Sequence, residues 1–247
     1  MKKLLLLLLT IVTIGFLAAP LSAQETVTIG TGTTTTYVTP FNSLWGYSFV
    51  EQIYTAEEIG TSGEITTVRF YHKPSSTPTA VQTNSIELYM KEVTRETFSS
   101  TSDFEVVTAN DIVYTGNFVI PIEEGWITIE LNTPFSYSGT SNLMIAMHEF
   151  TSGYSSRYFA YTATTGSVVT YHSDSANPDP YDLGSYSGNK YVSPNRANVQ
   201  LEIMPSGDNP CYKPNNFVVS NITESEATLS WTPREGQDAW QVCYSTE

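Results

Sequence analysis

The stretch of sequence that decides the fold is Trp126-Ile127-Thr128-Ile129-Glu130-Leu131, in which apolar and polar residues alternate. Successive side chains of a β-strand point to opposite faces, so this alternation predicts a strand with one buried face and one solvated face. The same pattern recurs in Ile86–Lys91 and in Val199–Ile203. In Leu143–Met147 every residue is apolar, which predicts a central strand that is covered on both faces.

About ten such runs, separated by turn residues, lie between Glu25 and Met204, and no helical period longer than two turns interrupts them. We therefore predict an all-β fold, a jelly-roll-like two-sheet β-sandwich over residues 24–205. Further strands are expected at Tyr47–Thr55, Glu64–His72, Asp111–Val119, Arg157–Thr162 and Ser167–His172.

The composition agrees with this fold class and limits the partners. Charged residues make up 15 % of the chain and aromatic residues 13 %, a balance that favours strands over helices. The 25 acidic residues outnumber the 11 basic ones, for a net charge of −14. Electrostatic repulsion makes nucleic acid and anionic membrane surfaces poor partners.

Residues 1–23 are predicted to be a signal peptide. Lys2 and Lys3 precede the apolar run Leu4–Ala19, and the small residues Ser22 and Ala23 suit a signal peptidase. The alternative is a retained membrane anchor, which the run of about 16 residues disfavours because a spanning helix needs ~20. We expect a protein that is exported through the inner membrane, secreted or held at the bacterial cell surface, and not inserted in a membrane after signal removal.

A linker rich in turn residues, 206–210, precedes a second unit at 211–247. Within that unit, Leu229-Ser230-Trp231 and Val242-Cys243-Tyr244 carry a resemblance to the fibronectin type III family. The segments that resemble strands A, B and C of such a domain are Pro214–Thr223, Ala227–Pro233 and Trp240–Tyr244.

The resemblance covers about 37 residues, whereas a fibronectin type III domain needs about 90. It therefore implies that the chain stops inside this domain and that residues 211–247 are poorly ordered in isolation. In the complete family fold Cys211 and Cys243 would lie at opposite poles, so the resemblance implies no disulfide between them.

The first domain carries a second resemblance, on Gly125–Ile145, Tyr54–Gly60 and Thr97–Phe104. These segments resemble modules of surface and secreted proteins of the Bacteroidota. Such modules are similar to adhesin-type jelly-roll domains that precede fibronectin type III repeats in proteins exported by type IX secretion. The resemblance implies a location and an architecture, and it carries no catalytic motif onto this sequence.

Motifs for catalysis are incomplete. His148-Glu149 lacks the second histidine of a zinc-peptidase helix and lies on a predicted strand. Gly184-Ser185-Tyr186-Ser187-Gly188 has tyrosine where a hydrolase nucleophile elbow needs serine. We predict no catalytic residue, while a glycosidase pair of carboxylates stays open because such a pair is defined in space.

The longest interruption of the strand pattern is Ser173–Pro194, and a loop of this length is often a lid or a binding loop. Tyrosines stack on sugar rings or grip peptides, and the alternative is that they pack the loop against the sandwich. The candidate ligand-binding residues are Tyr171, Asp179, Tyr181, Asp182 and Tyr186.

Three acids of this loop, Asp174, Asp179 and Asp182, are candidate calcium ligands, although their spacing matches no calcium-loop motif and solvated acids are the alternative. No other cofactor is expected. Asp174-Ser175-Ala176 resembles the acceptor for O-glycosylation in exported Bacteroidota proteins, which makes Ser175 a candidate modification site.

The leading functional hypothesis is a non-catalytic, adhesin-like protein of the cell surface that binds a glycan or a host or matrix protein. The first alternative is the N-terminal accessory region of a secreted peptidase or glycosidase whose catalytic domain lies beyond Glu247. The second is a structural spacer.

Overall fold

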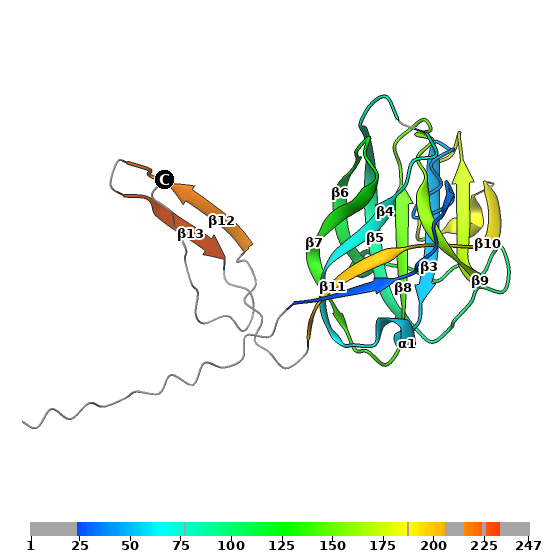
Figure 1. Cartoon of the computed structure of the whole chain (residues 1–247), viewed down its shortest axis with the longest axis horizontal. Helices are drawn as coiled ribbons and strands as arrows, with labels where there is room; N and C mark the ends of the chain where they lie inside the picture. Colours follow the sequence, from blue (N-terminus) through cyan, green and yellow to red (C-terminus); the bar gives the residue numbers. More distant parts are fainter. Residues whose placement is uncertain (1–23, 77, 187, 206–214, 224–225, 233–247) are drawn as a thin grey trace, which may run out of the picture.

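The structure is a computed structural model that describes residues 24–76, 78–186, 188–205, 215–223 and 226–232. The helical elements are α1 (Ala56–Ile59) and the 3-10 turns η1 (Ala109–Asp111) and η2 (Leu183–Ser185). The strands, most of which are labelled in Figure 1, are β1 (Glu25–Ile29), β2 (Thr34–Thr36), β3 (Tyr47–Tyr54), β4 (Gly63–His72), β5 (Gln82–Val93), β6 (Ile112–Ile120), β7 (Gly125–Tyr137), β8 (Asn142–Glu149), β9 (Phe159–Ser173), β10 (Asn189–Ala197), β11 (Val199–Pro205), β12 (Asn215–Ser220) and β13 (Thr228–Thr232). The predicted all-β sandwich class is confirmed.

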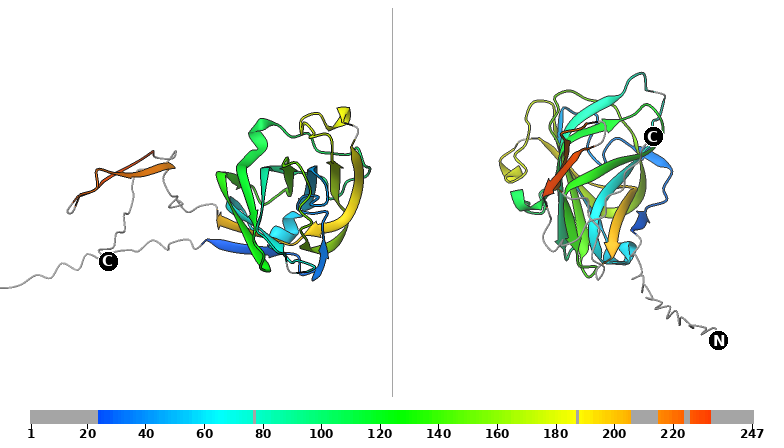
Figure 2. Two further views of the ribbon diagram at one scale, coloured as in Figure 1. Left: turned by 90° about the horizontal axis from the view of Figure 1, so that it is seen from above. Right: turned by 90° about the vertical axis from the view of Figure 1, so that its left-hand side faces the viewer.

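Eleven strands form one antiparallel sheet with the order β1-β11-β4-β9-β3-β8-β5-β6, in which β7 pairs with β4 while β2 and β10 pair with β9. The long strand β9 joins the two layers, because Phe159 at its start pairs with His72 of β4 and its later residues pair with β3. The view from above in Figure 2 shows the sheet curling so that its layers face each other.

Apolar residues of both layers meet in an inner core. Phe41, Phe118 and Phe159 lie at its centre, with ring centroids 5.9–6.1 Å apart. The alternation predicted for β7 is confirmed, since Ile127, Ile129 and Leu131 are buried while Thr128 and Glu130 are exposed.

Strand β8 lies between β3 and β5, and all of Leu143–Met147 is buried, as predicted for a central strand. Its outer face, with those of β3, β5 and β9, is covered by two loops, residues 94–108 and 174–186. A second apolar cluster fills the space beneath these loops, with Phe98 and Val107 from the first loop and Leu183 from the second.

In the second unit, β12 and β13 form a separate two-stranded antiparallel sheet, with Val219 opposite Leu229. These strands fall within the segments predicted as strands A and B. The predicted strand C, both cysteines, the linker 206–210 and the signal peptide lie outside the described residues. No helix among the described residues is long and apolar enough to cross a membrane.

Candidate ligand-binding cleft

The candidate site is built on the outer face of the β3-β8-β5 part of the sheet. The strand register places Glu51 opposite Ala146, and Ala146 opposite Tyr89. In the adjacent row of the same face, His148 lies opposite Glu87. Because residues two apart in a strand share a face, these polar side chains lie together beneath the two loops.

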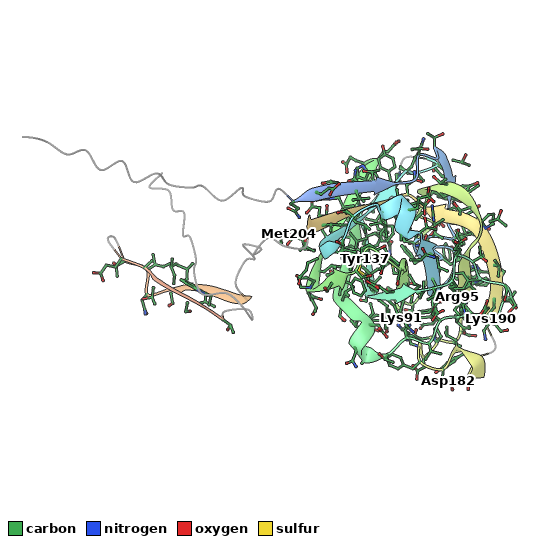
Figure 3. All side chains as sticks on the ribbon, turned by 90° about the horizontal axis from the view of Figure 1, so that it is seen from below. Lys91, Arg95, Tyr137, Asp182, Lys190 and Met204 are labelled. Carbon is green, nitrogen blue, oxygen red and sulfur yellow. The ribbon has the colours of Figure 1, made fainter. Side chains whose placement is uncertain are left out.

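Between the 94–108 loop and the 174–186 loop lies a shallow cleft of about 210 Å³. Its wall combines apolar and charged side chains, among them Phe104, Glu105, Val106, Tyr181, Asp182 and Lys190. Figure 3, which views the domain from below, shows Asp182 and Lys190 toward the same part of the domain as Lys91 and Arg95. The cleft therefore offers aromatic and apolar surface beside groups that form hydrogen bonds.

The 174–186 loop is held from beneath. The Tyr171 hydroxyl donates to the carbonyl of Ala176 at 3.2 Å, and the Lys190 ammonium donates to the carbonyl of Leu183 at 2.6 Å. A hydrogen bond of 2.9 Å joins His148 Nε2 to Asn177 Oδ1. Buried side chains thus fix the loop that carries Tyr181.

The 94–108 loop is fixed by charged groups. Arg95 bridges Asp103 at 2.9 Å and Glu105 at 2.7 Å, and the Lys91 ammonium donates to the carbonyl of Val106 at 2.7 Å. The backbone N–H of Glu105 donates to Glu51 Oε2 at 2.9 Å. Glu51 is fully buried, so it supports the loop from below.

The two carboxyl groups under the cleft are tuned in opposite directions. Burial raises the pKa of Glu51 well above its usual range, although the hydrogen bond from Glu105 opposes the shift. The nearby His148 and the hydroxyl of Tyr89 lower the pKa of Glu87. His148 Nδ1 lies 3.6 Å from Glu87 Oε2, slightly beyond the length of a normal hydrogen bond.

The predicted binding residues differ in whether they line the cleft. Tyr181 and Asp182 are exposed and line the cleft. Asp179 is exposed and accepts the backbone N–H of Tyr181 at 2.9 Å, which shapes the turn before the cleft. Tyr186 is half-buried and packs edge-on against Tyr171, with ring centroids 6.4 Å apart.

Tyr171 is a correction to the predicted site. Its side chain is fully buried in the outer apolar cluster, so it supports the loop and presents no ring to a ligand. The physical reason is that β9 is paired on both edges, by β3 and β10, while the loop closes over its outer face. The alternative of packing tyrosines thus describes Tyr171, and in part Tyr186.

The three predicted calcium ligands are exposed; Asp179 and Asp182 accept hydrogen bonds within their own turns, whereas Asp174 joins the loop to the segment before β3. Asp174 accepts the N–H of Gly46 at 3.1 Å, and Asp182 accepts the hydroxyl of Ser185 at 2.5 Å. Among the described residues, no group of three or more His, Cys, Asp or Glu side chains is placed to hold a metal ion. Ser175 is exposed on the same loop, and its modification stays a prediction.

Sequence reasoning missed the first wall of the cleft. Phe104, Glu105 and Val106 form that wall, and Lys190 of β10 also lines the cleft. The buried Glu51 lies below the wall and accepts the N–H of Glu105. Val106 is an apolar residue that is 72 % exposed in the structure, and its own segment does not reveal that exposure. Its position opposite the 174–186 loop depends on the fold of the whole sheet.

The site belongs to an all-β sandwich whose outer face carries a loop-built cleft. The chain matches no protein-family model, and no curated protein matches it.

Proposed function

We propose that the protein is an exported, non-catalytic binding protein that recognises a neutral carbohydrate at the cleft between the two loops. The proposal rests on one observation. Tyr181, which is 48 % exposed, lines a cleft whose two walls are held by buried and charged contacts. An aromatic ring on a pre-organised loop stacks on a sugar without the cost of ordering that loop.

The charges of the cleft favour a neutral ligand. Glu105 and Asp182 are acidic, and the whole chain carries a net charge of −14, so an anionic glycan is repelled here. Carboxylates and an ammonium group suit sugar hydroxyls, which both donate and accept hydrogen bonds. The apolar face of the ring would lie against Tyr181 and Val106.

The acidic groups of the cleft support binding more than hydrolysis. Glu51, the carboxyl whose pKa is raised, is fully buried and accepts a backbone N–H, while Glu105 is paired with Arg95. A glycosidase acid and its partner must both reach the scissile bond. Here the first is covered and the second is engaged in holding the loop.

Export and surface location complete the proposal. They are supported by the signal-like Met1–Ala23 and by the fibronectin-like pattern of residues 211–247, a spacer type that would hold the sandwich away from the cell. Fractionation of cells that express the chain tests this step. Retention in the cytoplasm with Met1 still attached would contradict it.

The binding test uses a panel of immobilised neutral oligosaccharides, followed by calorimetric titration of the tightest binder. Tyr181→Ala is expected to weaken binding by about tenfold or more, because it removes the stacking ring. Tyr154→Ala is the matched control, since Tyr154 is 72 % exposed and does not line the cleft.

Equal affinity of the wild type and Tyr181→Ala would remove the cleft from consideration. Binding to matrix proteins but to no sugar would replace the glycan with a protein ligand. If neither the oligosaccharides nor the matrix proteins bind, the result would support the alternative that the domain is a structural spacer.

A further inference from the structure

A second and larger pocket, of about 530 Å³, lies away from the cleft. Its walls are residues 74–76 and 78–80 between β4 and β5, Gln82 at the start of β5, and residues 155–158, which lead into β9. The chain has 25 acidic residues, yet none of the described residues that line this pocket is acidic. The pocket is therefore a local exception in a strongly acidic protein.

Arg157 lines this pocket and is only 8 % exposed. Its Nη2 donates to the carbonyl of Ala80, and its Nε is buried and has no hydrogen-bond partner in the part of the chain that the structure describes. The other arginines within the described residues each have an acidic partner, in the pairs Arg69–Glu202, Arg95–Asp103 and Arg196–Glu58. Among the described residues, no carboxylate lies within 4 Å of Arg157.

A buried guanidinium without a counter-charge is costly, because burial removes its hydration and the Ala80 carbonyl replaces only part of it. Burial lowers the pKa of Arg157, which reflects this cost. Burial lowers the pKa of the neighbouring His72, and the charge of Arg157 lowers it further. An anion from solution would complete the charge balance.

The position of Arg157 is fixed in advance by Ser43, which is buried. The Ser43 hydroxyl donates to the carbonyl of Arg157 at 2.5 Å and accepts its N–H at 3.1 Å. The Ser43 carbonyl accepts the N–H groups of Ser155 and Ser156 at 2.8 and 3.0 Å. This clamp holds the wall, so binding requires little ordering of the chain.

The remaining polar lining consists of hydroxyl and amide groups, from Ser75, Ser76, Thr79, Gln82, Ser155 and Ser156. Neutral donors and acceptors in this number suit a ligand with many hydroxyl groups. A guanidinium in the same wall suits a carboxylate, which it binds through two parallel hydrogen bonds.

We propose that this pocket is a second binding site, for a sugar that bears a carboxylate, of the hexuronic acid class. The carboxylate lies against Arg157, and the ring hydroxyls contact the serine and threonine side chains. The site is separate from the cleft and does not depend on the function proposed for it.

The test is calorimetric titration of the protein with glucuronate, with glucose and with inorganic phosphate. Glucuronate is expected to bind about tenfold or more tightly than glucose, which lacks the carboxylate, and more tightly than phosphate, which lacks the ring hydroxyls. This comparison needs no variant, so it holds even if substitutions in the wall impair folding.

Arg157→Gln is expected to lower glucuronate affinity to the level of glucose. Arg69→Gln is the matched control, because it removes the same charge at a site that does not line the pocket. Thr79→Val is expected to weaken glucuronate and glucose alike.

Equal affinity for glucuronate and glucose would overturn the role of Arg157. Phosphate binding as tight as that of glucuronate would overturn the sugar and leave an oxyanion site. Unchanged glucuronate affinity in a folded Arg157→Gln variant would overturn the proposal entirely.

Discussion

Glu149 is a buried acid at the end of β8, on the side of the strand that faces the inner core. Its Oε1 accepts the Asn84 amide at 2.9 Å and the Thr151 N–H at 2.8 Å. Its Oε2 is buried and has no hydrogen-bond partner among the residues that the structure describes. Burial outweighs the two hydrogen bonds and raises the pKa of Glu149 to about 7.

This shift makes the free energy of unfolding depend on pH. Between the ordinary value of 4.5 and about 7, the folded state keeps a proton that the unfolded state has lost. Stability is therefore greatest below pH 4.5 with respect to this group, and it falls as the pH rises toward 7. Each pKa unit corresponds to about 1.4 kcal/mol, so the loss from Glu149 is about 3 kcal/mol.

The perturbation is Glu149→Gln, which removes the titration and keeps the shape. Urea unfolding of both proteins between pH 4.5 and 8 gives the two stability curves. The wild type is expected to lose about 3 kcal/mol more than the variant over this range. A constant cost of the new amide cancels in this comparison, and so does the pKa rise of Glu51, because both proteins retain Glu51.

Parallel stability curves for the wild type and Glu149→Gln would refute the reasoning. They would mean that Glu149 is ionised in the folded protein without a penalty, so that water or a cation reaches Oε2. Direct titration of the carboxyl carbon by nuclear magnetic resonance would then place its pKa near 4.5.

Three further predictions concern packing and one buried ion-pair partner. Phe41→Ala removes a fully buried ring that contacts Phe118 and Phe159, and it is expected to cost about 4 kcal/mol in urea unfolding; a cost below 1 kcal/mol would contradict this. Arg196→Gln breaks the ion pair with Glu58, where the hydrogen bonds of Arg196 and Thr55 outweigh burial and lower the pKa of Glu58. It is expected to cost about 1–2 kcal/mol, because Glu58 is partly exposed and stays solvated, and to raise that pKa, which carboxyl titration would detect. Gly188→Ala places a methyl group on the ring of Tyr171, so it should shift the amide resonances of the 174–186 loop and leave those of the inner core in place.

The sequence predicts the strands in which apolar and polar residues alternate with a period of two, and those that lack this alternation because both faces are buried. In β7 each polar residue between Ile127 and Leu131 is exposed, because one face of that strand is solvated. In β8 the lack of alternation indicated burial on both faces, and both faces are buried. These patterns depend only on neighbours in the chain.

The helix α1 is a local feature that strand periodicity hides. Thr55 and Glu58 form a capping box, and Gly60 ends the helix with a positive φ of 70°. Four residues are too few to display a helical period, so the apolar pattern carried no sign of it. The cap residues themselves were a readable signal.

The cleft required information that no local pattern contains. Glu51, Ala146 and Tyr89 become neighbours only through the register of three strands from distant parts of the chain. The sequence favoured Tyr171 as a ligand-binding aromatic residue. Nothing in its own segment shows that the 174–186 loop closes over its side chain. Burial of such a residue is a consequence of topology.

The outer apolar cluster also supports these loops as the walls of the proposed binding site. Phe98 and Val107 bury apolar surface on the 94–108 loop, and Leu183 does so on the 174–186 loop, so the sandwich itself offsets the entropy lost in ordering them. A ligand then meets Tyr181 already in place. Affinity at the cleft should therefore depend on contacts with the exposed side chains, because substitutions there leave the buried anchors and the geometry of the loops intact.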